Sequence, residues 1–201
     1  MDRSIFYKDW KFEVCIQQLN PTLWRTCRVL SGSIRIQLLR QLHDGPGKSV
    51  SALATIVGIG VSDASQELRR IQSRGLLKAD RQGRHLIYRM EPDPQVPSAA
   101  PLLQALQSAL STLPHGRDAD MIPIAAGLAH PRRIQIAQLL RQSPQSPMAL
   151  RNATHIPLCP MNHHLNALKK GQWVQGNRNQ LAFALPAHPL AQALAALLAR
   201  E

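Results

Sequence analysis

Apolar side chains recur every three or four positions through much of this chain, a spacing that predicts short amphipathic helices. In the segment 33–43, for example, Ile36, Leu39 and Leu42 fall on one helical face, and the sequence His-Asp-Gly-Pro-Gly at 43–47 ends the helix. The first hundred positions predict helices over 1–20, 23–30, 33–43, 51–57 and 62–74. The pattern therefore indicates a mainly helical fold.

The fourth and fifth of these helices are separated by a tight glycine-containing turn at 58–60. Ser49 or Ser51 is the expected N-cap of the shorter helix, and Ser62 that of the longer one, because a serine hydroxyl accepts a hydrogen bond from a free backbone N–H. Gly75 then ends the longer helix. Two helices joined in this way predict a helix-turn-helix.

Two short runs rich in strand-forming residues follow, at 76–80 and 85–90, and the sequence Arg-Gln-Gly-Arg at 81–84 favours a turn between them. This arrangement predicts a β-hairpin. A linker over 91–100 contains several prolines, and an amphipathic helix over 102–113 comes after it. A helix-turn-helix followed by a hairpin is typical of a winged helix.

The same pattern then occurs a second time. Arg35-Ile-Gln recurs as Arg133-Ile-Gln at an offset of 98, and Leu68 matches Leu165 at an offset of 97. The second copy predicts helices over 122–128, 131–140, 148–154, 159–170 and 190–198, with a hairpin from 173–174 and 181–185. Self-similarity at a fixed offset indicates a repeated structural unit.

The expected fold class is mainly α with small β-hairpin wings, as two tandem winged helix-turn-helix domains. The N-terminal helical extension covers 1–22, the first domain 23–113 and the second domain 118–201. Each domain ends in its own closing helix.

The chain is strongly basic, with 24 Lys and Arg against 12 Asp and Glu and a net charge of +12. Both halves share the excess, since 1–100 holds 15 basic and 9 acidic residues and 101–201 holds 9 and 3. A shared excess favours a polyanionic partner, most simply nucleic acid. The alternative is a basic surface without a partner.

Several function classes find little support. The second half has only Asp118, Asp120 and Glu201 as acids, which disfavours paired-carboxylate chemistry and oxygen-ligated metals there. Phosphate-cradling glycine loops and Ser/His/Asp sets are missing, so an enzyme is not expected.

The sequence contains no run of 18 apolar residues, so no membrane span is expected. Three widely spaced cysteines make no disulfide framework, and a cytoplasmic protein is expected.

Residues 24–90 resemble the ArsR/SmtB family of bacterial repressors. The likeness rests on Ser33-Ile-Arg-Ile36, Leu53-Ala54, Gly58-Ile59, Ser62, Ser65, Leu68, Ile71, Gly75-Leu-Leu77 and the stretch 81–88 that ends in Tyr88. The second copy is more diverged and keeps Ala129-His-Pro-Arg-Arg-Ile134, His164-Leu165 and Gly171.

This resemblance implies selective binding to double-stranded DNA and repression by occluding a promoter. Family members are usually homodimers whose first and last helices form the dimer surface. The closing helices over 102–113 and 190–198 are therefore expected to pack together, making the chain an intramolecular pseudo-dimer. Metal sensors of the family carry ligands on the short or closing helix, and 51–57 and 102–113 carry none, so no cofactor is expected.

The second helix of a helix-turn-helix enters the major groove, where its early outward residues meet base edges. Glutamine suits adenine, and arginine suits guanine or phosphate. The candidate DNA-binding residues of the first copy are Ser62, Ser65, Gln66, Arg69, Arg70 and Arg74 on the helix, and Arg81, Arg84 and His85 on the hairpin. The alternative is that these positions are only solvated faces, and Asp63 and Glu67 would repel phosphate.

The candidates of the second copy are Asn162, His163, Asn166, Lys169, Lys170 and Arg178. Because the two sets differ, two interpretations stay open: an asymmetric DNA site, or loss of DNA contact by one copy. Cys159, His163 and His155 have a spacing of four that suits metal ligands, but Pro157 and Pro160 interrupt the helix and favour polar or DNA-facing roles.

The sequence thus favours a DNA-binding transcriptional regulator, with repression as the expected outcome. The alternative is an architectural or replication-type protein that holds DNA or a protein partner without regulating a promoter. A homodimer is also possible, through Phe6, Trp10 and Phe12 of the N-terminal helix.

Overall fold

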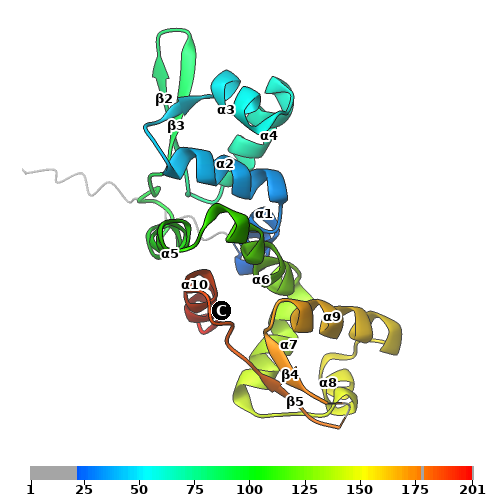
Figure 1. The fold of residues 1–201 in the computed structure, drawn as a ribbon. Helices are drawn as coiled ribbons and strands as arrows, with labels where there is room; N and C mark the ends of the chain where they lie inside the picture. The colour runs from blue at the N-terminus through cyan, green and yellow to red at the C-terminus, as the bar shows by residue number, and fades with distance from the viewer. Residues whose placement is uncertain (1–21, 178, 201) are drawn as a thin grey trace, which may run out of the picture.

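The computed structural model describes residues 22–177 and 179–200, whose arrangement is shown in Figure 1. The helix predicted over 1–20, with its suggested homodimer contact, lies outside the described residues. The same holds for the candidate DNA-binding residue Arg178. Within the described ranges, no helix is long and apolar enough to cross a membrane.

The first half of the described chain is a set of helices with one small sheet. Its elements are α1 (Leu23–Leu30), α2 (Ser33–His43), β1 (Lys48–Ser49), α3 (Val50–Val57), α4 (Val61–Gln72), β2 (Lys78–Gln82), β3 (His85–Arg89) and α5 (Ala99–Thr112). Ile36, Leu39 and Leu42 are all buried on α2. The periodicity of apolar positions therefore predicted this helix and its inner face correctly.

Helices α3 and α4 form the predicted helix-turn-helix. The Ser49 hydroxyl accepts a hydrogen bond from the Ala52 N–H at 3.2 Å, so Ser49 rather than Ser51 is the N-cap of α3. Gly58 follows α3 with a left-handed φ of 75°, a conformation that costs glycine little and reverses the chain within a few residues.

The prediction that Ser62 caps α4 is wrong. The helix begins one residue earlier, at Val61, because Gly60 is extended and its carbonyl accepts the Ala64 N–H at 2.9 Å. Ser62 is therefore the second helical residue and is exposed. Its hydroxyl makes no capping bond, which leaves it available to an external partner.

The hairpin also starts later than predicted. Leu76 and Leu77 were expected in its first strand, but they are buried in the core and the strand begins at Lys78. A third strand, β1, was not predicted because it is only two residues long. It pairs antiparallel with β3, with Lys48 opposite Tyr88, and ties the wing to the start of α3.

The linker predicted over 91–100 is shorter and more firmly packed than its prolines suggest. Helix α5 already begins at Ala99, and Val96 is buried. The Asp93 N–H donates to the Gly75 carbonyl at 2.9 Å. The segment therefore runs back along the end of the helix-turn-helix instead of hanging free.

The second half has the same succession of helices and hairpin. Its elements are η1 (His115–Asp120), α6 (Met121–Leu128), α7 (Pro131–Gln142), α8 (Pro147–Thr154), α9 (Leu158–Lys170), β4 (Val174–Gly176), β5 (Leu181–Phe183) and α10 (Pro189–Leu198). Ser146 caps α8 by accepting from the Ala149 N–H at 3.1 Å, as Ser49 does for α3. His155 has a left-handed φ of 54° in the place of Gly58.

Two details of this half differ from the prediction. The 3-10 helix η1 was not predicted. Trp173 was expected in a strand, but it is fully buried and β4 begins at Val174. Its indole Nε1–H donates to the Ile124 carbonyl at 2.7 Å, which joins the end of α9 to α6.

The two halves are joined through their first and last helices. Helix α1 packs on α6, and α5 packs on α10. Buried side chains of both halves form one continuous hydrophobic core. With this arrangement, α4 and α9 lie in the upper and lower parts of Figure 1 and both extend to its right-hand side.

Candidate nucleic-acid interface

Helix α4 is buried on one side and open on the other. Ala64, Leu68 and Ile71 are fully buried, which fixes the inner face of the helix. At helical spacing the opposite face carries Ser62, Gln66 and Arg69, and all three are exposed. The structure therefore brings these three predicted residues together in one outward stripe.

The other predicted residues of α4 lie on its flanks. Ser65 is half-buried. Arg70 is exposed but makes an ion pair with Glu67, and the same carboxylate pairs with Arg35 of α2. Arg74, just beyond the helix, is half-buried. Arg70 and Arg74 thus face α1 and α2 rather than the outward stripe.

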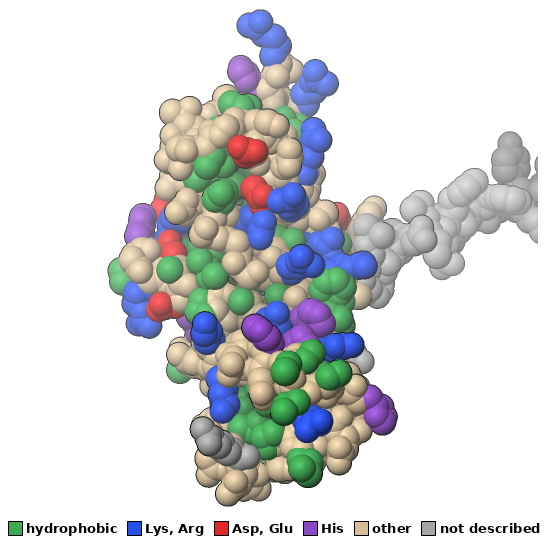
Figure 2. Space-filling view, turned by 90° about the vertical axis from the view of Figure 1, so that its right-hand side faces the viewer, with side chains coloured by type: hydrophobic (Ala, Val, Ile, Leu, Met, Phe, Trp, Pro, Cys, Tyr) green, Lys and Arg blue, Asp and Glu red, His purple; other side chains and the backbone are tan. Residues whose placement is uncertain are grey.

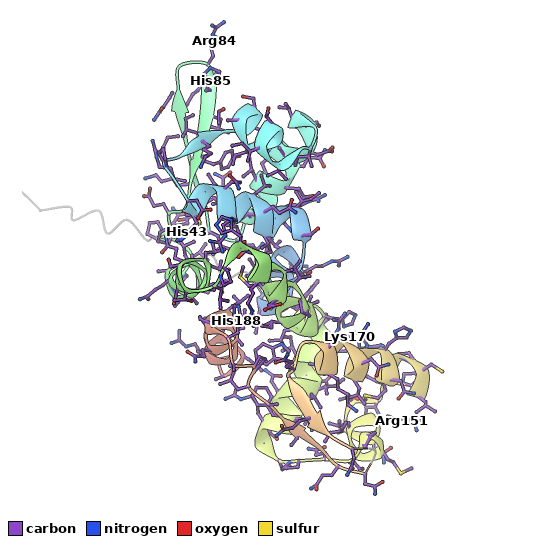
Figure 3. The ribbon with its side chains drawn as sticks, viewed as in Figure 1. His43, Arg84, His85, Arg151, Lys170 and His188 are labelled. Carbon is purple, nitrogen blue, oxygen red and sulfur yellow. The ribbon has the colours of Figure 1, made fainter. Side chains whose placement is uncertain are left out.

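The wing of the first half presents three predicted residues to solvent. Arg81, Arg84 and His85 are exposed. Arg84 and His85 lie at the far end of the hairpin, well beyond the helices (Figure 3). At the base of the wing, by contrast, Arg89 is held by Asp80 at 2.6 Å. The tip therefore carries positive charge that no nearby carboxylate neutralises among the described residues.

Helix α9 has the same two-sided organisation with different chemistry. Met161, Leu165 and Leu168 are buried. All five predicted residues of this helix are exposed, namely Asn162, His163, Asn166, Lys169 and Lys170. The basic residues of α9 are Lys169 and Lys170 at its C-terminal end, and those of α4 are Arg69 and Arg70 near its own end. Helix α9 has no acidic residue, whereas α4 also carries Asp63 and Glu67, so α9 has the higher net positive charge.

Helices α4 and α9 both reach the same side of the molecule, on the right of Figure 1. Figure 2 views that side and shows Lys and Arg side chains across its upper part and middle, with few Asp and Glu. Apolar side chains are more prominent in the lower part. A surface with this distribution can hold a long polyanion across both halves.

Within the second half, His130 before α7 and His164 on α9 lie with their ring centroids 4.7 Å apart. Burial, the larger cause, and the nearby charges of His130, Arg133 and Arg132 together lower the pKa of His164 to about 4. The pKa of His130 is lowered by the same two causes. Both rings are therefore neutral near pH 7, and the surrounding cationic field is left to the arginines.

The cysteine and histidines of α8 and α9 do not make a metal site. Cys159, His163 and His155 are each exposed. Over the described residues, no group of three or more His, Cys, Asp or Glu side chains is placed to hold a metal ion.

Sequence reasoning missed one basic feature of this side, a cleft between α1, α2 and α4. Its volume is about 510 Å³, and it is lined by Trp24, Arg25, Arg28, Val29, Arg35, Arg70 and Arg74. The available signal was the spacing of Arg25 and Arg28, which places both on the side of α1 opposite its buried residues. We call this feature the arginine cleft.

The first half thus has a helix-turn-helix followed by a hairpin, the arrangement of a winged helix. Comparison with known proteins agrees with this description over part of the chain. No family model matches the sequence. A stretch of 63 residues, 31% of this chain, is 36% identical to the HTH-type transcriptional regulator NmtR of Mycobacterium tuberculosis (strain ATCC 25618 / H37Rv). The chain spans 52% of the length of that relative, about half.

Among solved structures, one similar chain comes from Mycobacterium bovis. It is the solution NMR structure of the homodimeric winged helix-turn-helix DNA-binding domain of Mb0332, described as a possible ArsR-family transcriptional regulator. The sequences are 27% identical, and the match covers 56% of this chain and 95% of that one with a TM-score of 0.36.

Proposed function

We propose that this chain is a DNA-binding transcriptional regulator that represses by covering a promoter. The observation that carries the proposal is the outward stripe of α4, where Ser62, Gln66 and Arg69 are exposed beside a cationic wing. Glutamine can bind adenine and arginine can bind guanine through paired hydrogen bonds. Arg84 and His85 at the wing tip then contact phosphates or the minor groove.

The two halves act as a pseudo-dimer in one chain. The packing of α1 on α6 and of α5 on α10 supports this, because equivalent helices of the two halves meet. A covalent connection gives the second half a high effective concentration near DNA once the first half is bound. Asn162, Asn166 and Lys169 on α9 supply its contacts, so the DNA site is asymmetric.

The first residues of both reading helices add an apolar contact. Val61 is 55% exposed and Leu158 is 52% exposed, and the two positions correspond at an offset of 97. Helix starts of this kind enter the major groove first, where thymine is marked by its methyl group. Retention of an exposed apolar residue in both halves supports a thymine in each half-site.

The proposal is tested by selecting bound duplexes from a random pool and measuring affinity for the selected site. Arg69→Ala is expected to lower affinity by about 1–3 kcal/mol and to relax the preference at one base pair. Arg200→Ala is the matched control, because it removes one exposed arginine that follows α10, an element that lies away from α4 in Figure 1. We expect the control to bind like the unaltered protein.

Two results would contradict the proposal. Recovery of unrelated duplexes, with uniform coverage in a footprint, would favour an architectural protein. Equal losses in Arg69→Ala and Arg200→Ala would mean that α4 does not read DNA. Detectable turnover of nucleic acid would further contradict a function based on binding alone.

A further inference from the structure

The arginine cleft is a concave site beside the reading face and not part of it. Trp24, Arg25 and Arg28 line it from α1, Arg35 from α2, and Arg70 and Arg74 from the end of α4. Its volume of about 510 Å³ is ample for one or two phosphate groups.

The charges in the cleft are far from balanced. Five guanidinium groups face one carboxylate, Glu67, which pairs with Arg35 and Arg70. For Arg25, Arg28 and Arg74 the structure shows no carboxylate partner within the described residues. Burial lowers the pKa of Arg74, and the charge of Arg25 lowers it further. An uncompensated positive field of this kind attracts an anion.

One of the cleft arginines has a structural role that recurs in the second half. Arg35 has a structural role, because it donates to the carbonyls of Val29 and Arg28 at the end of α1. Arg133 repeats that role in the second half by donating to the Ala126 carbonyl. The role of Arg35 therefore explains one of the five cleft arginines.

The other cleft positions change chemistry in the second half. At the offsets of 98 and 97, Arg25 corresponds to Pro123, Arg28 to Ala126, Arg70 to Ala167 and Arg74 to Gly171. The same succession of helices forms there without these four arginines. Arg25, Arg28, Arg70 and Arg74 are therefore not needed to form these helices and can serve a ligand.

We propose that the arginine cleft binds phosphate groups, at one site per chain. Guanidinium groups suit this ligand, because their planar N–H donors form paired hydrogen bonds with phosphate oxygens. The Trp24 ring lies at the edge, with the Arg25 guanidinium carbon 5.0 Å from its centroid. The walls thus offer several donors and one aromatic face.

The phosphate groups can come from two sources. Arg70 and Arg74 follow the reading stripe along α4, so the backbone of a bound duplex is one source, and this case rests on the proposed function. A free phosphorylated ligand is the other, and it needs no DNA. The second half, which lacks the four corresponding arginines, would then bind duplex with fewer phosphate contacts.

The test uses the double variant Arg25→Gln with Arg28→Gln in the full chain. Both positions are exposed on α1, so the fold is expected to survive. The matched control is Arg117→Gln with Arg200→Gln, which removes the same charge at two exposed positions elsewhere. Circular dichroism during thermal unfolding checks that both variants remain folded.

One arm titrates inorganic tripolyphosphate into each protein without DNA, by calorimetry. Affinity that falls about tenfold or more in the cleft variant, and not in the control, supports the proposal with a free ligand as source. The other arm measures the salt dependence of binding to the selected duplex. A slope reduced by about 2 in the cleft variant alone supports the proposal with the DNA backbone as source.

The proposal is overturned if the cleft variant and the control behave alike in both arms. This outcome is distinct from failure of the proposed function. If no duplex is bound by any protein, the regulator proposal fails, and tripolyphosphate binding alone decides the cleft. If duplex binding depends on Arg69 while neither arm responds to the cleft variant, the regulator proposal stands and the cleft proposal fails.

Discussion

A buried ion pair joins the two halves of the molecule, and its removal gives a quantitative prediction. Arg40 of α2 is 5% exposed, and its Nε donates to Asp118 Oδ2 in η1 at 2.7 Å. The same guanidinium donates to the carbonyls of Leu110 at 2.6 Å and Leu113 at 3.4 Å. Arg40 therefore anchors the connection between α5 and α6 to the core of the first half.

The expected cost of Asp118→Ala follows from this burial. Removing one partner of a buried ion pair destabilises a protein by about 3–5 kcal/mol, because the remaining charge is left without compensation. Asp44 Oδ1, 3.5 Å from Arg40, and the two carbonyls retain part of the interaction. We therefore expect the lower end, about 3 kcal/mol, which corresponds to a fall in Tm of about 6–12 °C for a chain of this size.

The assay is urea unfolding followed by circular dichroism, with Asp120→Ala as the matched control. Asp120 pairs with Arg117 at 2.8 Å, but both side chains are largely exposed, so its loss should cost no more than about 1 kcal/mol. Arg40→Met with Asp118→Leu should recover most of the stability, because an apolar pair leaves no buried charge. Equal costs for Asp118→Ala and Asp120→Ala would refute the reasoning.

Three further predictions concern the second half. His155→Gly should stabilise the chain by about 0.5–1 kcal/mol in urea unfolding, because a left-handed φ of 54° suits glycine, as at Gly58; a destabilised variant would argue against strain. The pKa of His164 is about 4 in the folded chain against an ordinary 6.5, so the folded state binds the proton less well. The contribution of neutral His164 to stability is present above pH 6.5 and is lost as the pH falls toward 4. The Tm of the unaltered protein should therefore drop over this window, and the Tm of His164→Gln should drop less. An equal drop in the two proteins would exclude His164 as the cause. Trp173→Phe removes the 2.7 Å bond to the Ile124 carbonyl and should cost about 1–3 kcal/mol in urea unfolding, whereas an unchanged midpoint would show that the bond is dispensable.

Local sequence signals placed most elements to within a few residues. The helices predicted over 23–30 and 33–43 have the observed bounds, because their apolar spacing and the polar or glycine-containing segments after them act locally. The errors in the starts of the two hairpins occur where tertiary packing decides whether a residue joins a strand or the core. Leu76 and Trp173 fit a strand by composition, but both are drawn into the core before the hairpins begin.

For the candidate DNA-binding residues too, local spacing predicted part of the arrangement and tertiary packing decided the rest. Spacing alone identified the outward residues of α4 and α9, since a helix with a buried stripe must expose its opposite face. It did not separate Arg69, which faces outward, from Arg70, which pairs with Glu67. That pairing depends on how α4 packs against α2, which helical spacing does not determine.

The amino-acid sequence by itself determined most of the helices, the excess of positive charge and the recurrence of one pattern, because each depends on neighbours within a few positions or on simple counting. The tertiary structure decided which arginines come together. Arg25, Arg35 and Arg74 are separated by up to 49 positions, yet they line one cleft because α1, α2 and α4 fold around a common core. The burial of apolar faces sets that arrangement, and the charges are carried into place with it.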